Sequence, residues 1–163
     1  MLRISMAKVE PDDKKAIEQR AVFLLGRREH SASELARKLR DKGFAADAVD
    51  EVISELQERG WQSDQRFTES YVRQRIEAGY GPLKIYSDMA QKGIQRTLVE
   101  QILESTNVDW VAVAADRYQR RFGTEAATED KEKARRQRHL ASRGFLSSHV
   151  YAAISKVHDD DRS

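Results

Sequence analysis

The sequence predicts an all-α protein made of three tandem three-helix repeats that form an elongated, curved array. Three observations support this fold class. Eight glycines and two prolines in 163 residues are few for a many-turned β-sandwich, and aromatic residues, at 7%, are scarce for a β-rich core. Apolar residues recur at helical spacing along the chain. A similar segment also returns about every 50 residues, as in repeat proteins.

The returning segment is predicted to be a helix that ends at a glycine. A Lys/Arg-Gly-apolar triplet begins at Lys42, Lys92 and Arg143. Glycine readily adopts the left-handed conformation that closes an α-helix, and the basic residue before it faces the negative end of the helix dipole. The apolar residue after each glycine is expected to pack on an apolar residue of the same helix. The expected pairs are Phe44 with Leu39, Ile94 with Met89, and Phe145 with Leu140.

Other signals predict where helices begin. Ser31 and Glu34 fit a capping box, in which the serine accepts from a first-turn amide and the glutamate reaches back. At the matching place in the second repeat, Pro82 follows Gly81, and proline suits the first helical position because its missing amide hydrogen loses nothing there. Upstream of each start, apolar residues share a helical face. These faces comprise Ile17, Ala21, Leu24 and Leu25; Phe67, Tyr71, Val72 and Ile76; and Trp110, Val113, Ala114, Arg117 and Tyr118.

These signals divide the chain into repeats and terminal segments. The predicted boundaries are a flexible leader at 1–13, three-helix repeats at 14–61, 62–106 and 107–157, and an acidic tail at 158–163. A unit of about 50 residues buries only a small core, so the repeats are expected to lean on one another. Trp61 is expected to pack in the core or between the first two repeats.

The sequence lacks the residue patterns of most enzymes. Without cysteine there is no disulfide framework, thiolate metal site or cysteine nucleophile, which is compatible with a reducing cytosol. No phosphate-binding glycine loop is present, and the four histidines have no metal-ligand spacing. No apolar run is long enough to span a membrane. We therefore expect a cytoplasmic protein that is not an enzyme, uses no cofactor or metal, and is a monomer because no heptad run or large apolar stripe favours a dimer.

Basic residues gather toward the end of the chain. The totals are 29 Lys and Arg against 27 Asp and Glu, but Trp110–Val157 holds ten basic and five acidic residues. This block favours an anionic partner, such as a nucleic-acid backbone or an acidic protein face, although long charged side chains also coat exposed helices. Lys131, Arg135 and Arg138 follow at i, i+4 and i+7 and are expected to form one cationic stripe.

Two candidate binding residues have alternative interpretations. Arg136 stands where the earlier repeats have Leu35 and Ile85, so its stem either packs while its head reaches water, or its guanidinium engages a carboxylate or phosphate. Tyr80 is either an exposed anchor or a cover for the core of its own repeat. The candidate partner-binding residues are Arg73, Arg75, Tyr80, Lys84, Arg117, Arg120, Arg121, Lys131, Arg135, Arg136, Arg138 and Arg143.

One run, Arg66–Ile94, combines four features in a fixed order. They are Phe67, the step Tyr71-Val72-Arg73, the turn Gly79-Tyr80-Gly81-Pro82 and the helix stop Lys92-Gly93. This order resembles the central signature of the RecX family of bacterial recombination regulators. The likeness extends over about Lys14–Val157 and includes the three-unit layout. The third unit departs from the family pattern, because Gln137 and His139 replace more usual aromatic residues and the connection from Phe122 to Asp130 is longer.

The resemblance implies a protein that binds RecA, the recombinase that forms filaments on DNA. RecX proteins modulate and usually inhibit RecA by lodging in the filament groove, which depresses ATP hydrolysis, strand exchange and coprotease activity. Contact with single- or double-stranded DNA of the filament is a further expectation because the third repeat is basic.

A direct DNA-binding regulator is the alternative, since a helix, a glycine turn and a second helix also describe a helix-turn-helix. In the first repeat, however, the helix after the turn is acidic and would be repelled by phosphates. Its carboxylates are Asp47, Asp50, Glu51, Glu55 and Glu58.

Overall fold

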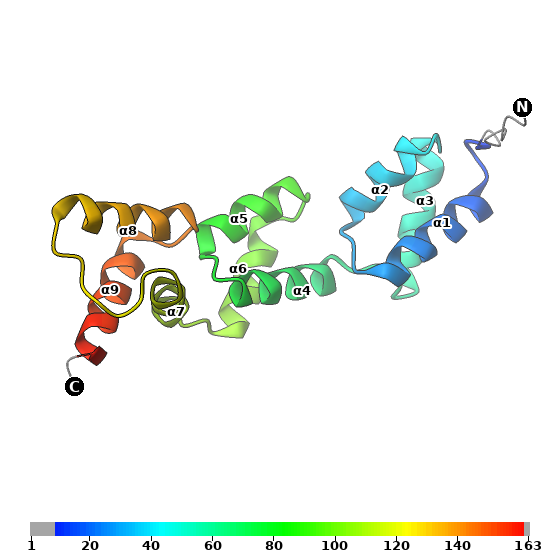
Figure 1. Cartoon of the computed structure of the whole chain (residues 1–163). Coiled ribbons are helices and arrows are strands. Elements are labelled where there is room, and N and C mark those ends of the chain that lie inside the picture. Colours follow the sequence, from blue (N-terminus) through cyan, green and yellow to red (C-terminus); the bar gives the residue numbers. More distant parts are fainter. Residues whose placement is uncertain (1–8, 162–163) are drawn as a thin grey trace, which may run out of the picture. The chain divides into compact units, whose positions relative to one another are not determined.

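The structure is a computed structural model that describes residues 9–161, and within that range it contains helices and connecting turns but no strand (Figure 1). The helices follow one another in three groups of three. They are α1 (Lys14–Arg27), α2 (Ala32–Asp41), α3 (Ala46–Glu58), α4 (Asp64–Glu77), α5 (Pro82–Gln91), α6 (Arg96–Thr106), α7 (Trp110–Phe122), α8 (Asp130–Ser142) and α9 (Ser147–Asp161). This order confirms the prediction of an all-α protein with tandem three-helix repeats. The chain divides inside α4, after Phe67, into an N-terminal and a C-terminal compact unit.

The middle helix of each repeat ends at a glycine, as predicted. Gly43, Gly93 and Gly144 have φ angles of 104°, 74° and 96°, which place them in the left-handed region. The amide after each glycine donates to a carbonyl five positions back, which is the hydrogen bond of a Schellman motif. These bonds are Phe44 to Leu39 (3.3 Å), Ile94 to Met89 (3.0 Å) and Phe145 to Leu140 (3.4 Å), and all six side chains are buried.

The predicted helix starts are also observed. The Ser31 hydroxyl accepts from the Glu34 amide at 3.1 Å, and the Glu34 carboxylate accepts from the Ser31 amide at 3.3 Å, which completes the capping box. Glu34 is buried, and Arg28 donates two hydrogen bonds to its carboxylate, at 2.8 and 3.1 Å. In the second repeat, Gly81 is the N-cap and Pro82 the first residue of α5.

The core of the N-terminal unit is formed by α1, α2 and α3. Ile17, Leu35, Leu39, Val49 and Leu56 are fully buried there. The described part of the predicted leader is attached to this core. The side chain of residue 9 (Val) packs against the core, and the carbonyl of residue 11 (Pro) accepts a hydrogen bond from the amide of residue 45 (Ala) at 2.8 Å. The rest of the leader, residues 1–8, lies outside the described residues.

Trp61 does not pack in the core, so that prediction is wrong. Its side chain is 47% exposed. Gly60, just before it, has a φ of 76°, and Gln62, the residue after Trp61, is buried instead. The buried Gln62 amide is satisfied because it donates to the His30 carbonyl at 3.1 Å and accepts from Gln57 at 2.9 Å.

The C-terminal unit contains most of the second repeat and all of the third. Tyr118, Leu140 and Phe145 form the centre of the core that α7, α8 and α9 share. Helix α9 continues to Asp161, so the acidic residues predicted to form a tail are helical as far as that position. Among the described residues, no helix combines the length and the apolar character needed to cross a membrane.

Candidate functional site

The second and third repeats meet backbone to backbone at two glycines. The Gly81 amide donates to the Arg143 carbonyl at 2.8 Å, and the Leu83 amide donates to the Gly144 carbonyl at 2.9 Å. A Cβ atom on Gly81 would lie 2.5 Å from the carbonyl carbon of Gly144, and one on Gly144 would lie 2.5 Å from the amide nitrogen of Lys84. Only glycine at both positions allows this approach, which fixes the start of α5 against the end of α8.

Tyr80 lies at this junction and is covered by arginine. The guanidinium of Arg143 lies over the Tyr80 ring, 3.7 Å from its centroid, and that of Arg75 lies 5.1 Å from the same centroid. Arg143 Nε also donates to the Gly79 carbonyl at 3.2 Å, and its Nη2 donates to the Ala78 carbonyl. These carbonyls follow the end of α4, where the helix dipole favours a cation. Tyr80 and Arg143 therefore contact each other across the repeat junction.

Arg117 of α7 brings a third guanidinium group to the junction. A Cβ atom on Gly79 would lie 3.1 Å from Arg117 Cδ, so the arginine stem packs directly on that glycine. Arg117 Nε also donates to Nε2 of His139 at 3.4 Å. Burial lowers the pKa of His139, and Arg117 and other nearby arginines lower it further, which keeps the ring neutral and able to accept this bond. Burial and the charge of Arg117 also lower the pKa of Arg143.

A single buried carboxylate, Asp88, balances part of this charge. It accepts a hydrogen bond from the Tyr71 hydroxyl at 2.8 Å and lies 3.1 Å from Lys84 Nζ and 3.6 Å from Arg75 Nε. Within residues 9–161, Arg117 and Arg143 make no ion pair. Sequence reasoning missed Asp88, although its spacing of four from Lys84 on one helix was a usable signal. We call the whole set the junction cluster: Arg75, Tyr80, Lys84, Asp88, Arg117 and Arg143.

The predicted stripe on α8 is exposed but not uniformly cationic. Arg135 donates two hydrogen bonds to Glu132, at 2.8 and 2.9 Å. Hydrogen bonds from Arg135 and Arg136 lower the pKa of Glu132 to about 2, so this carboxylate is ionised and neutralises the middle of the stripe. In the described part of the chain, Lys131 and Arg138 make no hydrogen bond or ion pair and are exposed.

The remaining candidates differ in how much of their charge is available. Arg136 is mostly buried and donates to the Tyr118 hydroxyl at 2.9 Å and to the carbonyl of Glu125 at 2.8 Å. It therefore ties the connection before α8 to the core. Its guanidinium also donates to the Glu132 carboxylate of the same helix at 3.1 Å, and its side chain is only 13% exposed, so the charged head is engaged within the chain rather than reaching water. Arg120 pairs with residue 116, an aspartate, at 2.8 Å. Arg73 on α4 and Arg121 at the end of α7 are exposed.

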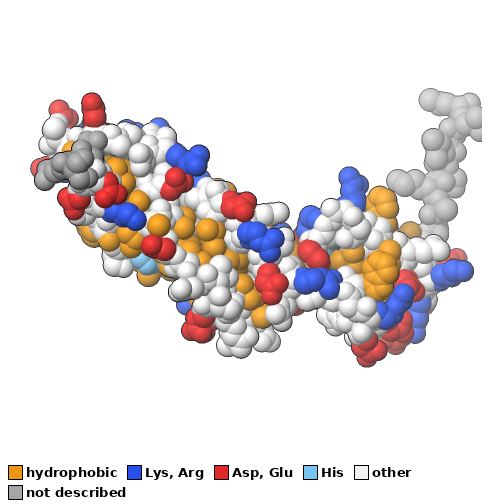
Figure 2. Space-filling model, turned by 90° about the horizontal axis from the view of Figure 1, so that it is seen from below, with side chains coloured by type: hydrophobic (Ala, Val, Ile, Leu, Met, Phe, Trp, Pro, Cys, Tyr) orange, Lys and Arg blue, Asp and Glu red, His pale blue; other side chains and the backbone are white. Residues whose placement is uncertain are grey.

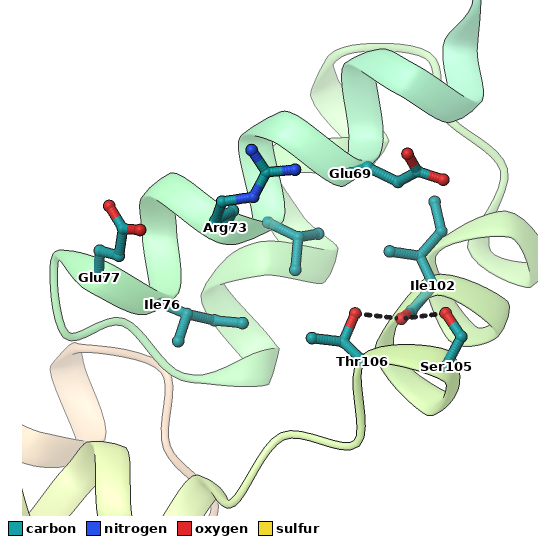
Figure 3. Close-up of a pocket in the computed structure, with 8 residues that line it drawn as sticks. Glu69, Arg73, Ile76, Glu77, Ile102, Ser105 and Thr106 are labelled. Atoms are coloured by element: carbon teal, nitrogen blue, oxygen red, sulfur yellow. Dashed lines mark hydrogen bonds between the residues drawn. The ribbon is translucent and has the colours of Figure 1, made fainter.

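The second repeat also has a groove that sequence reasoning missed. It has a volume of about 480 Å³ and lies between α4 and α6 (Figure 3). Its lining comprises Glu69, Val72, Arg73, Ile76, Glu77, Ile102, Ser105 and Thr106. Among residues 9–161, no group of three or more His, Asp and Glu side chains is placed to hold a metal ion.

Comparison with known proteins gives a consistent result over most of the chain. Three family models match in order: the first three-helix domain of RecX over residues 19–56, the second over 63–103 and the third over 108–154. The regulatory protein RecX of Legionella pneumophila is 42% identical over 143 residues, which cover 88% of this chain and 93% of the relative. That of Halorhodospira halophila is 37% identical over 146 residues, which cover 90% and 91%.

Solved structures share the fold. A crystal structure of RecX from Lactobacillus salivarius matches with a TM-score of 0.73 and 22% identity, covering 90% of this chain and 97% of the other. A second crystal structure, of regulatory protein RecX, matches with a TM-score of 0.72 and 23% identity over 88% and 71% of the two chains. The three domain matches and the sequence relatives together show that the chain belongs to the RecX family of regulatory proteins.

Proposed function

We propose that this protein binds the RecA filament in the bacterial cytoplasm and modulates, mostly inhibits, its ATPase, strand exchange and coprotease activity. The observation on which the proposal rests is the presence of all three RecX domains in order. A regulator of this kind needs extended contact with a polymer rather than a pocket for chemistry, and exposed basic residues on several helices suit such contact.

The junction cluster is the part of this surface best supported as a contact with the filament. Its glycine contact holds two repeats in one geometry, so binding would cost little conformational entropy there. Arg117 and Arg143 have no carboxylate partner among the described residues, and guanidinium groups bind carboxylates and phosphates well. Arg73, Arg121, Lys131 and Arg138 extend the proposed contact because they are exposed. Arg120, Arg135 and Arg136 contribute less because each already pairs with a carboxylate.

A helix-turn-helix regulator that reads a DNA site is the weaker candidate. In the first repeat, the helix after the turn is α3, and its acidic residues at positions 47, 50, 51, 55 and 58 are all exposed. A recognition helix with this charge would be repelled by the phosphates beside the major groove.

The proposal is tested by adding the purified protein to RecA on single-stranded DNA and following ATP hydrolysis and strand exchange. We expect inhibition at fewer than one molecule per RecA protomer. Reversing two exposed charges of α8, in the double variant Arg135→Glu and Arg138→Glu, should weaken inhibition without unfolding the chain. The matched control is Arg37→Glu with Arg40→Glu on α2, which makes the same change of net charge. Unchanged RecA activity together with tight binding to a defined duplex site would instead support the DNA-binding regulator.

A further inference from the structure

The second repeat lacks a core residue that the other two repeats have. Thirteen positions after the helix-ending glycine, the first repeat has Leu56 and the third has Val157, both buried, whereas the second has Thr106. Helix α6 also ends at this threonine, because Asn107 takes a left-handed conformation with a φ of 52°. Helix α6 has 11 residues, against 13 in α3 and 15 in α9. The groove between α4 and α6 is thus open where the third helix of the other repeats supplies an aliphatic side chain.

The interior of the α4–α6 groove is apolar. Ile76 of α4 and Ile102 of α6 point into the space between the helices, and Val72 is buried beside them (Figure 3). The hydroxyls of Ser105 and Thr106 both donate to the carbonyl of Ile102, at 3.0 and 2.7 Å, so they are satisfied within their own helix. Figure 2 shows one whole face of the molecule, on which hydrophobic side chains are exposed between scattered charged ones. The groove therefore suits an apolar side chain rather than a polar small molecule.

Charged residues border the groove along α4. Glu69, Arg73 and Glu77 follow at i, i+4 and i+8, so they stand in one row on the helix. The row alternates in sign and has a net charge of −1. A partner helix with basic residues spaced to reach the two glutamates, and an aliphatic residue between them, would be complementary in both charge and shape.

Resting on the proposed function, we propose that the α4–α6 groove receives an amphipathic helix of RecA, anchored by an aliphatic side chain with basic residues on either side. A helix is favoured over a strand because the walls are helices and offer no free backbone edge for strand addition. A second copy of this chain is disfavoured. In a symmetric dimer with its two-fold axis at the centre of the row, Arg73 of one copy would face Arg73 of the other. Glu69 of each copy would face Glu77 of the other, so like charges would meet at all three positions.

Because the chain has no cysteine, one introduced cysteine can carry a single photo-crosslinker. Ser105→Cys places the probe in the groove, and Thr97→Cys on the same helix, outside the groove, is the matched control. After attachment of benzophenone maleimide and irradiation with RecA filaments, we expect about tenfold more crosslinked RecA from position 105. Peptide mapping should place the crosslink on a RecA helix with aliphatic and basic residues. Crosslinks from position 105 to DNA or to another copy of this chain would overturn the proposal.

A substitution that fills the groove with a larger side chain of the chain itself provides a second test. Thr106→Leu supplies the residue type found at the matching position of the first repeat and should preserve or raise the melting temperature. We expect half-inhibition of RecA to need about ten times more of this variant, and Thr97→Leu to behave as the parent. A folded Thr106→Leu variant that inhibits as well as the parent overturns the groove proposal and leaves the proposed function standing. A parent chain that neither binds nor inhibits RecA overturns both.

Discussion

His30 is a buried histidine whose ring faces two basic residues. Its Nδ1 lies 3.0 Å from the Arg28 carbonyl and its Nε2 lies 3.0 Å from Lys38 Nζ. The geometry fits a neutral ring that donates through Nδ1 and accepts the lysine proton at Nε2. Burial lowers the pKa of His30. The hydrogen bond to the Arg28 carbonyl and the charge of Glu34 raise it, and the charges of Arg28 and Lys38 lower it, so that the pKa lies below its ordinary value.

A lowered histidine pKa makes stability depend on pH in mild acid. In the unfolded chain, a histidine has a pKa of about 6.5 and binds a proton below that pH. In the folded chain, His30 binds this proton only at a lower pH because its pKa is lowered. The free energy of unfolding should therefore fall as the pH decreases from about 6.5 toward the pKa of folded His30. His30→Gln should flatten part of this fall in urea unfolding experiments between about pH 7 and 5. His158→Gln is the control, and an NMR titration that places the His30 pKa above its ordinary value would contradict the assignment.

At the scale of helices, the contact between Gly81 and Gly144 determines how α5 meets α8. Gly81→Ala would place a methyl group 2.5 Å from the carbonyl group of Gly144 and from the amide of Phe145, both of which are backbone. Neither can move without breaking the paired hydrogen bonds of the junction. We expect a loss of about 2 kcal/mol or more in the free energy of unfolding, measured by urea denaturation.

Gly26→Ala is the matched control for that experiment. Gly26 lies inside α1, with no atom within 4 Å of the added Cβ and no positive φ. Alanine there should stabilise the helix, by up to about 1 kcal/mol, because it loses less backbone entropy on folding. Equal effects of the two substitutions would show that the close approach at Gly81 is not a constraint on the fold.

The helix ends could be predicted from sequence because the residues that decide them are close in the chain. The Ser31 capping box and the stop at Gly43 each depend on side chains or amides within five positions. Arg143 and Gly79, in contrast, are 64 positions apart, and no spacing rule brings them together. The apolar size of Trp61 predicted burial, but the structure leaves its side chain exposed and buries the neighbouring Gln62 instead.

The candidate site was only partly predictable for the same reason. Basic composition indicated which residues carry charge, and most of them are exposed or at the junction. Composition could not indicate that Glu132 neutralises Arg135, or that Arg136 is used to hold the carbonyl of Glu125. The open groove had a sequence signal, Thr106 in place of an aliphatic residue, but this signal has meaning only once the three repeats are aligned on their glycines.

For the whole molecule, the distribution of charge matters more than its total. The formal net charge is only +2. If binding depended on this net charge alone, the long-range attraction to DNA or to an acidic filament would be weak. Exposed Lys131 and Arg138 belong to the basic third repeat, whereas exposed Lys15 and Arg37 belong to the first repeat, in which basic and acidic residues are nearly balanced. The two pairs contain one lysine and one arginine each, which makes them suitable for a position test.

Replacing each pair by glutamine separates location from total charge. Both double variants lower the net charge by two, so a purely global electrostatic effect would weaken filament binding equally. If the third repeat contacts the filament, Lys131→Gln with Arg138→Gln should weaken binding several-fold and reduce its dependence on salt. Each lost phosphate contact would lower the slope of log affinity against log salt by about 1. Lys15→Gln with Arg37→Gln should leave both the affinity and its salt dependence near those of the parent.

Binding to RecA filaments is measured by fluorescence anisotropy between about 50 and 200 mM salt. Equal losses in the two variants would mean that the filament responds to total charge, and the contact residues proposed on α8 would then be wrong.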